Sequence, residues 1–338
     1  MFSCPSCFRE VVWCISLPKQ VLFFNNSFIV HEFEKMPPMT KLVNGFWGPP
    51  TSTLDWCEEN YAVSQFVAEF WNTISNWIMI VPPLLGAILT WQTRHETRYM
   101  LAFLSLFVVG VGSFSFHATL LYHMQLLDEL PMIYCTCVFL FCIFECASQP
   151  GHTNIRLIFS LTACSMLITI VYLTFVNPLV FQWAYGILAG SLTLLALYKL
   201  RQHRGSRKLL MISIISYGSG FILWNFENNF CPTVRDLRTK SIIPLQPLTQ
   251  LHAIWHLLAG IGSYYHILYS FDLRMRCRGK HTTVKLMWDW LPYIHLTNAK
   301  LKSDMTLVHK KGGISSSTSS LFQLLFAADY SNNNTRGQ

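Results

Sequence analysis

Two pairs of polar side chains in separate apolar stretches have the types and spacing of a metal-dependent hydrolytic site. His252 and His256 lie four residues apart in one stretch, and Ser113 and His117 lie four residues apart in another. Residues at this spacing share one face of a helix, so each pair can point toward a common centre. Three neutral imidazoles on a tetrahedral zinc ion leave one position open for water, as in hydrolytic rather than structural sites. We therefore predict that His117, His252 and His256 bind zinc. His123, in the turn after the second apolar stretch, is an alternative to His117, and a hydrogen-bonded packing role without a metal is the alternative for the pair His252 and His256.

Asp128, at the start of the next apolar stretch, is the predicted general base. Zinc lowers the pKa of bound water to about 7 and polarises a carbonyl group. A carboxylate can then take the proton of that water and pass it to a leaving amine. The residue after His252 is Ala253, not the glutamate of the metalloprotease pattern, so the base has to come from another helix. The Ser113 hydroxyl is predicted to donate to the developing oxyanion.

The elements that must hold these residues are membrane-spanning helices. The chain has 338 residues, of which 52% are hydrophobic and only 12% charged, and a soluble domain carries about twice that charged fraction. Apolar runs of about twenty residues recur, and each can cross about 30 Å of hydrocarbon as a helix. The sequence thus predicts an all-α fold, a seven-helix transmembrane bundle. The expected spans are Phe66–Trp91, Tyr99–Leu121, Leu126–Ala147, Leu157–Val176, Leu179–Tyr198, Leu209–Phe226 and Leu248–Phe271. Pro82 and Pro83 are expected to kink the first span.

Lysine and arginine are distributed unequally between the connections. One side of the membrane receives most of them, namely Arg94, Arg98, Arg156, Lys199, Arg201, Arg204, Arg207, Lys208, Arg274, Arg276, Arg278 and Lys280. The positive-inside rule then puts the C-terminus in the cytoplasm and the segment before the first span in the lumen. The three histidines and Asp128 would fall at one depth near the lumenal boundary, where apolar helices favour an amphiphilic substrate from the lipid. The net charge of +8 follows the connections and not one face, so nucleic acid is not an expected partner.

Hard oxygen donors crowd the segment before the first expected span. Asp55, Glu58, Asn60 and Glu69 fall within about fifteen residues, and oxygen donors of this kind suit Ca²⁺. The spacing lacks the glycine of an EF-hand loop, so an acidic interfacial loop without a metal is the alternative interpretation.

The eleven cysteines are too scattered for a disulfide scaffold. Cys57 in the acidic segment and Cys231 after the sixth span both fall on the expected lumenal side, where disulfides form. A bridge between them is a hypothesis, because sequence alone does not establish that they are close. Four further cysteines inside an apolar run are interpreted as small buried apolar residues: Cys135, Cys137, Cys142 and Cys146.

Several segments resemble those of the alkaline ceramidases, most closely the alkaline phytoceramidase branch. They include "GFWGPPTSTLDWCEENY", "AEFWNTISNWIMIVPP", "GSFSFH", "MQLLDELPMIY" and "QLHAIWHLLAGIGSYYHI". The resemblance runs from about Gly45 to Leu296 and implies a seven-helix membrane amidase of the endoplasmic reticulum and Golgi. Such an enzyme cleaves ceramides, including phytoceramide and unsaturated long-chain ceramides, to a sphingoid base and a fatty acid. No obligate protein partner is inferred.

The same resemblance assigns roles residue by residue. It implies zinc binding by His117, His252 and His256, with Ser113 and Asp128 completing the site. It implies calcium binding by Asp55, the Trp56 carbonyl, Glu58, Asn60 and Glu69, and a disulfide between Cys57 and Cys231. Residues 1–44 are expected to be a poorly ordered extension, 45–296 the seven-helix domain, and 297–338 a poorly ordered cytoplasmic tail.

Two other functions are compatible with a bundle of this kind. A receptor of the progestin and adiponectin receptor type also holds a zinc–histidine cluster but needs no turnover. A transporter could use Asp128, Glu145 and Glu227 as ionisable relay groups. Because Glu145 and Glu227 lie near helix ends, structural or interfacial roles are favoured for both. The arrangement of Ser113, Asp128 and the histidines around an open zinc position favours hydrolysis.

Overall fold

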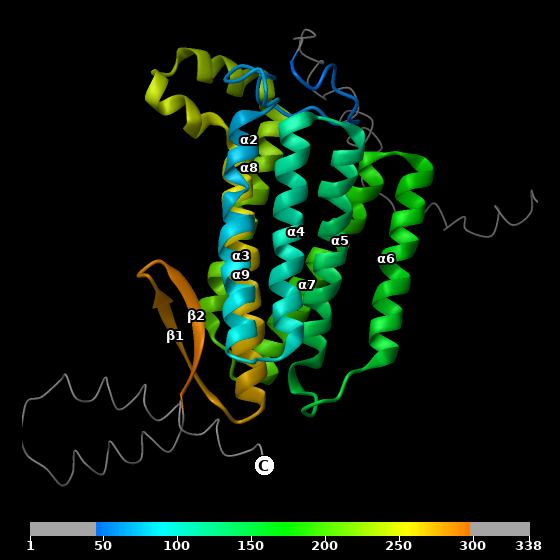
Figure 1. Ribbon diagram of the computed structural model, residues 1–338, viewed down its shortest axis with the longest axis vertical. Helices are drawn as coiled ribbons and strands as arrows, with labels where there is room; N and C mark the ends of the chain where they lie inside the picture. Colours follow the sequence, from blue (N-terminus) through cyan, green and yellow to red (C-terminus); the bar gives the residue numbers. More distant parts are fainter. Residues whose placement is uncertain (1–44, 298–338) are drawn as a thin grey trace, which may run out of the picture.

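The apolar stretches form helices that lie side by side, with a β-hairpin at one end of the bundle (Figure 1). In the computed structural model of the chain, the described residues are 45–297. The helices are α2 (Phe70–Ser75), α3 (Trp77–Gln92), α4 (Thr97–Thr119), α5 (Tyr122–Phe144), α6 (Ile155–Phe175), α7 (Pro178–Gln202), α8 (Arg207–Lys240) and α9 (Leu251–Cys277), with 3-10 turns η2 (Glu145–Ala147) and η3 (Ile243–Thr249). The expected extension and tail, residues 1–44 and 298–338, lie outside the described residues.

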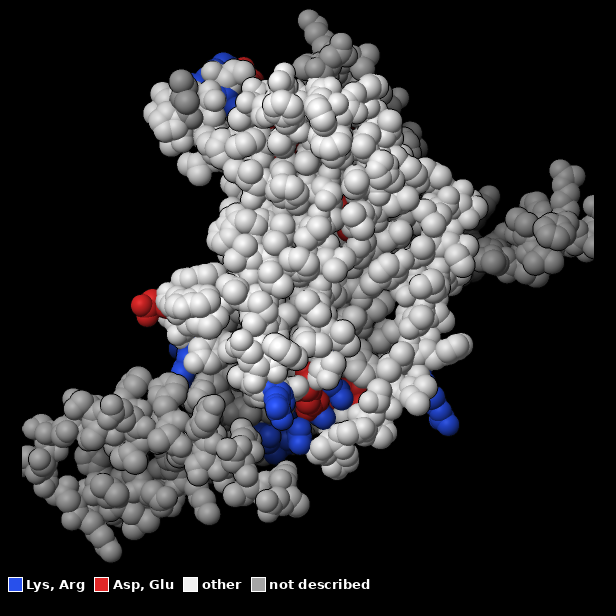
Figure 2. Space-filling view, viewed as in Figure 1, with Lys and Arg blue, Asp and Glu red and all other residues white. Residues whose placement is uncertain are grey.

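Within residues 45–297, six helical segments are long and apolar enough to cross a membrane: Phe70–Gln92, Thr97–Thr119, Tyr122–Ala147, Ile155–Phe175, Pro178–Gln202 and Arg207–Lys240. They indicate a multi-pass membrane protein. α9 falls outside this set because the imidazoles and terminal charges within it lower its mean hydropathy. Figure 2 shows charged side chains gathered mainly at the two ends of the visible face, with an almost uncharged surface between.

Helices α3, α4, α5 and α9 form the packed centre of the bundle, and α6 lies at its edge. On α6 only Ser165 and Tyr172 are buried, while Phe159 is 75% exposed. Large apolar side chains exposed in this way need an apolar surrounding, which a bilayer supplies. The central helices are therefore the rigid part of the molecule on which a site can be built.

Local sequence signals explain several helix ends. Asn177 caps α7 by accepting from the Leu179 amide, and Pro178 occupies the first helical position, where its missing N–H costs nothing. Asn154 caps α6 in the same way, by accepting from the Leu157 amide. The Asn177 cap and Pro178 explain why the tight turn between α6 and α7 falls at Asn177–Pro178, as the sequence predicts.

The helices differ in detail from the expected spans. The first span has a break at Asn76, between α2 and α3, and Pro82 and Pro83 lie buried inside α3. α8 extends well past Phe226 to Lys240, with non-helical angles at Phe230 just before Pro232. Since Pro232 cannot donate a backbone hydrogen bond, the chain bends there, and the rest of α8 turns over the acidic segment.

The prediction of an all-α fold is wrong for the residues after α9. Strands β1 (His281–Met287) and β2 (Leu291–Thr297) form an antiparallel hairpin. Its turn places Trp288 and Asp289 in left-handed conformations. Short hairpin turns of this kind normally contain glycine or asparagine, so the sequence carries no recognisable turn signal.

Candidate metal centre

Three buried imidazoles meet where the end of α4 lies beside the start of α9. His117 is in the last turn of α4, and His252 and His256 occupy successive turns of α9. One ring nitrogen of each lies within 4.8 Å of the others, and the side chains are 1–4% exposed. The structure therefore brings the three predicted zinc ligands into one cluster near the end of the bundle that also carries α2 (Figure 1).

Hydrogen bonds fix the tautomers of two of these rings. The Nδ1 atom of His117 donates to Glu69 Oε2 at 2.5 Å. The Nδ1 atom of His256 lies 3.0 Å from the Asn72 carbonyl and 2.8 Å from Ser75 Oγ. Since a carbonyl oxygen can only accept, Nδ1 of His256 carries the proton, and Nε2 of both rings presents a lone pair. This arrangement, with an outer partner on the second nitrogen, is the usual setting of metal-binding histidines.

The cluster also contains buried polar atoms without partners. They include Nε2 of His117 and Nδ1 of His252. An unpaired buried acceptor costs about 1–3 kcal/mol, and a bound cation would satisfy the Nε2 lone pair of His117. The donor set, neutral imidazoles with a carboxylate behind one of them, fits zinc. The residues present thus fit the metal that the sequence predicts. Trp56 packs against His252, with ring centres 4.2 Å apart and the rings tilted by 31°.

Ser113 and Asp128 lie against each other across the contact between α4 and α5. The Ser113 side chain lies within reach of the Asp128 carboxyl. The helices approach this closely because residue 112 is glycine: a Cβ atom there would lie 2.0 Å from the Leu127 carbonyl oxygen and 3.2 Å from Asp128 Cα. Gly112 is therefore a positioning residue for the predicted serine–carboxylate pair, and the sequence reasoning missed it.

The acidic segment folds over the start of α2. Both carboxylate oxygens of Glu58 accept from the first turn of α2, from Trp71 N at 2.7 Å and Asn72 N at 2.8 Å. The Asn60 amide donates to Asp55 at 3.2 Å, while Asn60 Oδ1 has no partner. Burial, together with the neighbouring carboxylate of Glu69, raises the pKa of Glu58 to about 8.

Glu69 belongs to this segment but faces the histidines. Besides His117, its carboxylate accepts from Asn72 Nδ2 at 3.1 Å and Trp56 N at 3.3 Å. Burial and the charge of Asp55 raise the pKa of Glu69 to about 8. Two neighbouring carboxylates with pKa values raised by burial fit a cation site, as does the unpartnered Asn60 oxygen. The predicted calcium ligands are therefore neighbours, although the compact three-residue clusters among residues 45–297 do not include them.

The bent end of α8 holds the acidic segment in place. Cys57 and Cys231 form a disulfide with Cα atoms 5.6 Å apart. The Arg238 guanidinium donates to the Cys57 carbonyl at 3.1 Å and to Glu59 at 2.5 Å. On the same helix, Glu227 accepts from Leu251 N at 3.1 Å. Glu227 thereby caps α9 and sets where the histidine helix begins, which is a structural role of the kind expected for it.

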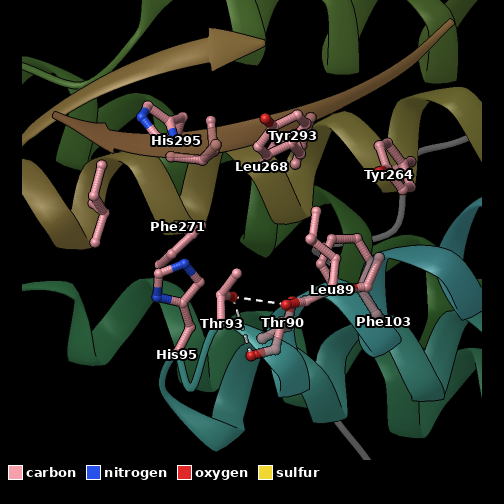
Figure 3. Close-up of a pocket in the computed structure, with 13 residues that line it drawn as sticks. Leu89, Thr90, Thr93, His95, Phe103, Tyr264, Leu268, Phe271, Tyr293 and His295 are labelled. Carbon is pink, nitrogen blue, oxygen red and sulfur yellow. Dashed lines mark hydrogen bonds between the residues drawn. The ribbon is translucent and has the colours of Figure 1, made fainter. Parts of the chain in front are cut away.

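A cavity of about 170 Å³ lies at the other end of α9, under the hairpin. Figure 3 shows Leu89, Thr90 and His95 on one wall and Tyr293 and His295 of β2 opposite. The hydroxyls of Thr90 and Thr93 are bonded to carbonyls of their own helix. None of the predicted zinc or catalytic residues lines this cavity, so it is separate from the histidine cluster.

Comparison with known proteins identifies the family. The family model described as Ceramidase matches residues 48–295. Mouse alkaline ceramidase 3 is 47% identical over 251 residues, covering 74% of this chain and 94% of the relative. Yeast alkaline ceramidase YPC1 is 33% identical, covering 73% and 84%, and an Arabidopsis thaliana alkaline ceramidase is 30% identical, covering 76% and 98%. These matches confirm the resemblance found in the sequence and disfavour the receptor alternative: the chain belongs to the ceramidase family of hydrolases.

Proposed function

We propose that this protein is a zinc-dependent membrane amidase that hydrolyses the N-acyl bond of ceramides to a sphingoid base and a free fatty acid. The observation that carries the proposal is the buried cluster of His117, His252 and His256, whose ring nitrogens lie within 4.8 Å of one another, one helical turn along α4 from Ser113. Its relatives are named ceramidases, and an amide is a substrate that this set of groups can hydrolyse. Phytoceramide and unsaturated long-chain ceramides are the proposed substrates.

The proposed roles follow from the groups themselves. Zinc held by the three histidines would supply an acidic water and a polarised carbonyl. Asp128 accepts the proton of the attacking water and delivers it to the departing sphingoid amine, so the carboxylate ends as it began. Ser113 donates its hydroxyl hydrogen to the oxygen of the scissile carbonyl as negative charge develops there. Glu69, Ser75 and Asn72 orient two of the imidazoles and keep their Nε2 atoms unprotonated.

We further propose that α9 is a seventh span and that the histidine end of the bundle faces the lumen of the endoplasmic reticulum or Golgi. The segment before the first span would then be lumenal and the C-terminus cytoplasmic. The basic residues near the opposite end of the helices support this orientation, and a Cys57–Cys231 disulfide suits an oxidising lumen. Substrate would reach the cluster from the bilayer.

Calcium is proposed as a structural ion of the acidic segment, bound by Asp55, the Trp56 carbonyl, Glu58, Asn60 and Glu69. Its charge would offset the burial of the carboxylates. Because Glu69 also accepts from His117, ordering of this segment bears directly on the orientation of a zinc ligand. Removal of calcium should lower activity without removing a catalytic group.

The decisive test is product release by purified protein from unsaturated long-chain ceramide and phytoceramide, with wild type beside His252→Ala. Hydrolysis by wild type alone, abolished by zinc chelation and restored by zinc, is the expected result. Absence of hydrolysis by a folded wild type that holds zinc would overturn the proposal and favour a zinc-containing receptor.

A further inference from the structure

A second group of metal-binding side chains lies at the opposite end of the bundle from the histidine cluster. Cys146 is in η2, His203 follows α7, and Cys277 is the last residue of α9. One donor atom of each lies within 4.8 Å of the others. Three chain segments that are distant in sequence thus bring two sulfurs and one imidazole together, and the proposed hydrolytic function uses none of them.

The contacts of Cys146 distinguish it from the neighbouring cysteines of α5. Cys135 accepts a hydrogen bond from Ser105 at 3.3 Å, and Cys142 donates to the Arg98 carbonyl. Cys146 instead lies within hydrogen-bonding reach of the Cys277 thiol. Cys146 is buried, as the sequence predicts, and its sulfur also lies near two other possible metal ligands.

The donor set has the chemistry of a zinc site. Thiolate and imidazole together are typical zinc ligands, with Zn–S about 2.3 Å and Zn–N about 2.0–2.1 Å. Tetrahedral geometry then puts donor atoms about 3.5–3.8 Å apart. From separations of at most 4.8 Å, the donor atoms need to approach by about 1.3 Å at most, which side-chain rotation allows.

The charges around the cluster are compatible with a bound dication. Lys199 and Arg274 are the cationic side chains near Cys146. The Arg274 charge is already balanced by Glu96, which accepts from its Nε at 3.0 Å. Two thiolates would neutralise one Zn²⁺, so binding adds no net charge to the end of the bundle.

The frame of the cluster is set by contacts that need no metal. Arg274 donates to the carbonyls of Glu145 at 2.9 Å and Ser148 at 2.5 Å, which fixes η2 against α9. The Tyr269 hydroxyl donates to the Ala196 carbonyl at 2.9 Å, which fixes α7 against α9. Cys146 is fully buried, whereas His203 and Cys277 are half-buried and leave a route for an ion to enter.

From this arrangement we propose a structural zinc site formed by Cys146, His203 and Cys277, with water as the fourth ligand. It joins the ends of α5, α7 and α9 and is separate from the proposed catalytic ion. Because its ligands include sulfur, cobalt bound there differs spectroscopically from cobalt bound by three histidines.

The test is titration of metal-free, full-length protein in detergent with Co²⁺, recording cobalt bound per chain and the thiolate-to-cobalt charge-transfer absorption. Wild type should bind two equivalents, one of them with that absorption. Cys277→Ser and His203→Ala should each lose one equivalent, and Cys277→Ser should lose most of the absorption. Cys137→Ser and His152→Ala are matched controls that should retain both.

The two proposed metal sites can be tested independently of each other. His252→Ala should lose one equivalent of cobalt and keep the thiolate absorption in full, whatever its activity. A wild type without that absorption, or a Cys277→Ser variant that keeps it, would overturn the proposal. So would peptide mapping under anaerobic, non-reducing conditions that found Cys146 and Cys277 joined in a disulfide.

Discussion

The two ends of α9 both bury polar side chains, but they satisfy them differently. At the end of the helix, Arg274 is fully buried and bonded to Glu96 and to carbonyls of the α5–α6 connection. At the start, the buried imidazoles of His252 and His256 lie beside His117, and ring nitrogens of the cluster lack partners. One end has opposite charges in place, whereas the other directs ring nitrogens toward a common centre.

This difference separates groups that hold the bundle together from groups that bind and react. Buried charges that are paired contribute to folding, and breaking such a pair is costly. Buried acceptors left without partners destabilise a fold and persist where a ligand completes them. Substitutions at the start of α9 should therefore change activity or metal affinity, and substitutions at its end should change stability.

The largest effect is expected for Asp128→Asn. The amide has the same shape and can still bond to Ser113, but it cannot accept a proton from water. General base catalysis contributes about 10²–10⁴-fold, so kcat should fall by that range while zinc content and thermal stability stay close to wild type. The measurement is ceramide turnover at saturating substrate. Glu129→Gln, at the adjacent carboxyl, is the matched control, and an equal loss there would refute the assignment of Asp128.

Gly112→Ala should produce the next largest loss. The new methyl group would meet the Leu127 carbonyl at 2.0 Å, so α4 and α5 must separate and Ser113 must move relative to Asp128. A misplacement of about 1 Å can cost about a hundredfold in rate. We expect kcat to fall by about that factor with zinc still bound. Gly190→Ala on α7, where an added Cβ has nothing within 4 Å, should leave turnover unchanged.

Glu69→Gln should weaken zinc binding by about 10–100-fold, the usual effect of removing an outer partner of a metal-binding histidine. A glutamine carbonyl still accepts a hydrogen bond from His117 but lacks the charge that makes its ring a stronger ligand. Zinc affinity is measured by competition with a chelator at saturating calcium. Glu58→Gln is the comparison, since Glu58 bonds to α2 and not to a histidine. Equal zinc affinities for both variants would mean that Glu69 acts through calcium alone.

The start of α9, where ring nitrogens lack partners, is the unpaired end, and the Arg274 end is the paired end. The sequence predicts the residues of the unpaired end better than the contacts between them. The spacing of His252 and His256 and the similar spacing of Ser113 and His117 survive folding, because a helix preserves such spacing. Glu69 was assigned to calcium only, and its bond to His117 spans 48 residues, which no local pattern encodes. Ser75 was missed for the same reason, being 181 residues from His256.

The paired end was harder to predict because its features depend on packing or on an unusual turn. The sequence predicts Arg274 only as one of the basic residues of the connections, yet it bonds to Glu96 across 178 residues. The hairpin was missed because Trp288 and Asp289 adopt left-handed conformations without glycine. Cys146 and Cys277 lie 131 residues apart, a separation obtained from their sequence positions, and only the adjacency of α5 and α9 reveals them as a possible ligand pair.

The smallest effect on catalysis, and a clear effect on stability, is expected for Glu96→Gln at the paired end. Partial burial opposes ionisation of Glu96, but hydrogen bonds and charge from Arg274, with Arg98 and Arg278, outweigh it and lower the pKa of the carboxyl. A hydrogen bond to a charged group contributes about 1.5–3 kcal/mol, so the variant should lose about 2 kcal/mol of folding free energy near neutral pH.

The pH dependence of that loss gives the sharper test. Because the pKa of Glu96 is depressed in the folded state, its stabilisation is complete above the unfolded pKa of about 4.5 and disappears as pH falls through the lower folded value. Wild type and Glu96→Gln should therefore differ in thermal stability at pH 7 and converge at acidic pH, with ceramide turnover alike wherever both are folded. Asp236→Asn, which breaks an exposed pair with Lys240, should cost less than about 1 kcal/mol. A Glu96→Gln variant that kept its stability but lost turnover would place a catalytic function at the paired end. That result would contradict the assignment of stability to one end of α9 and activity to the other.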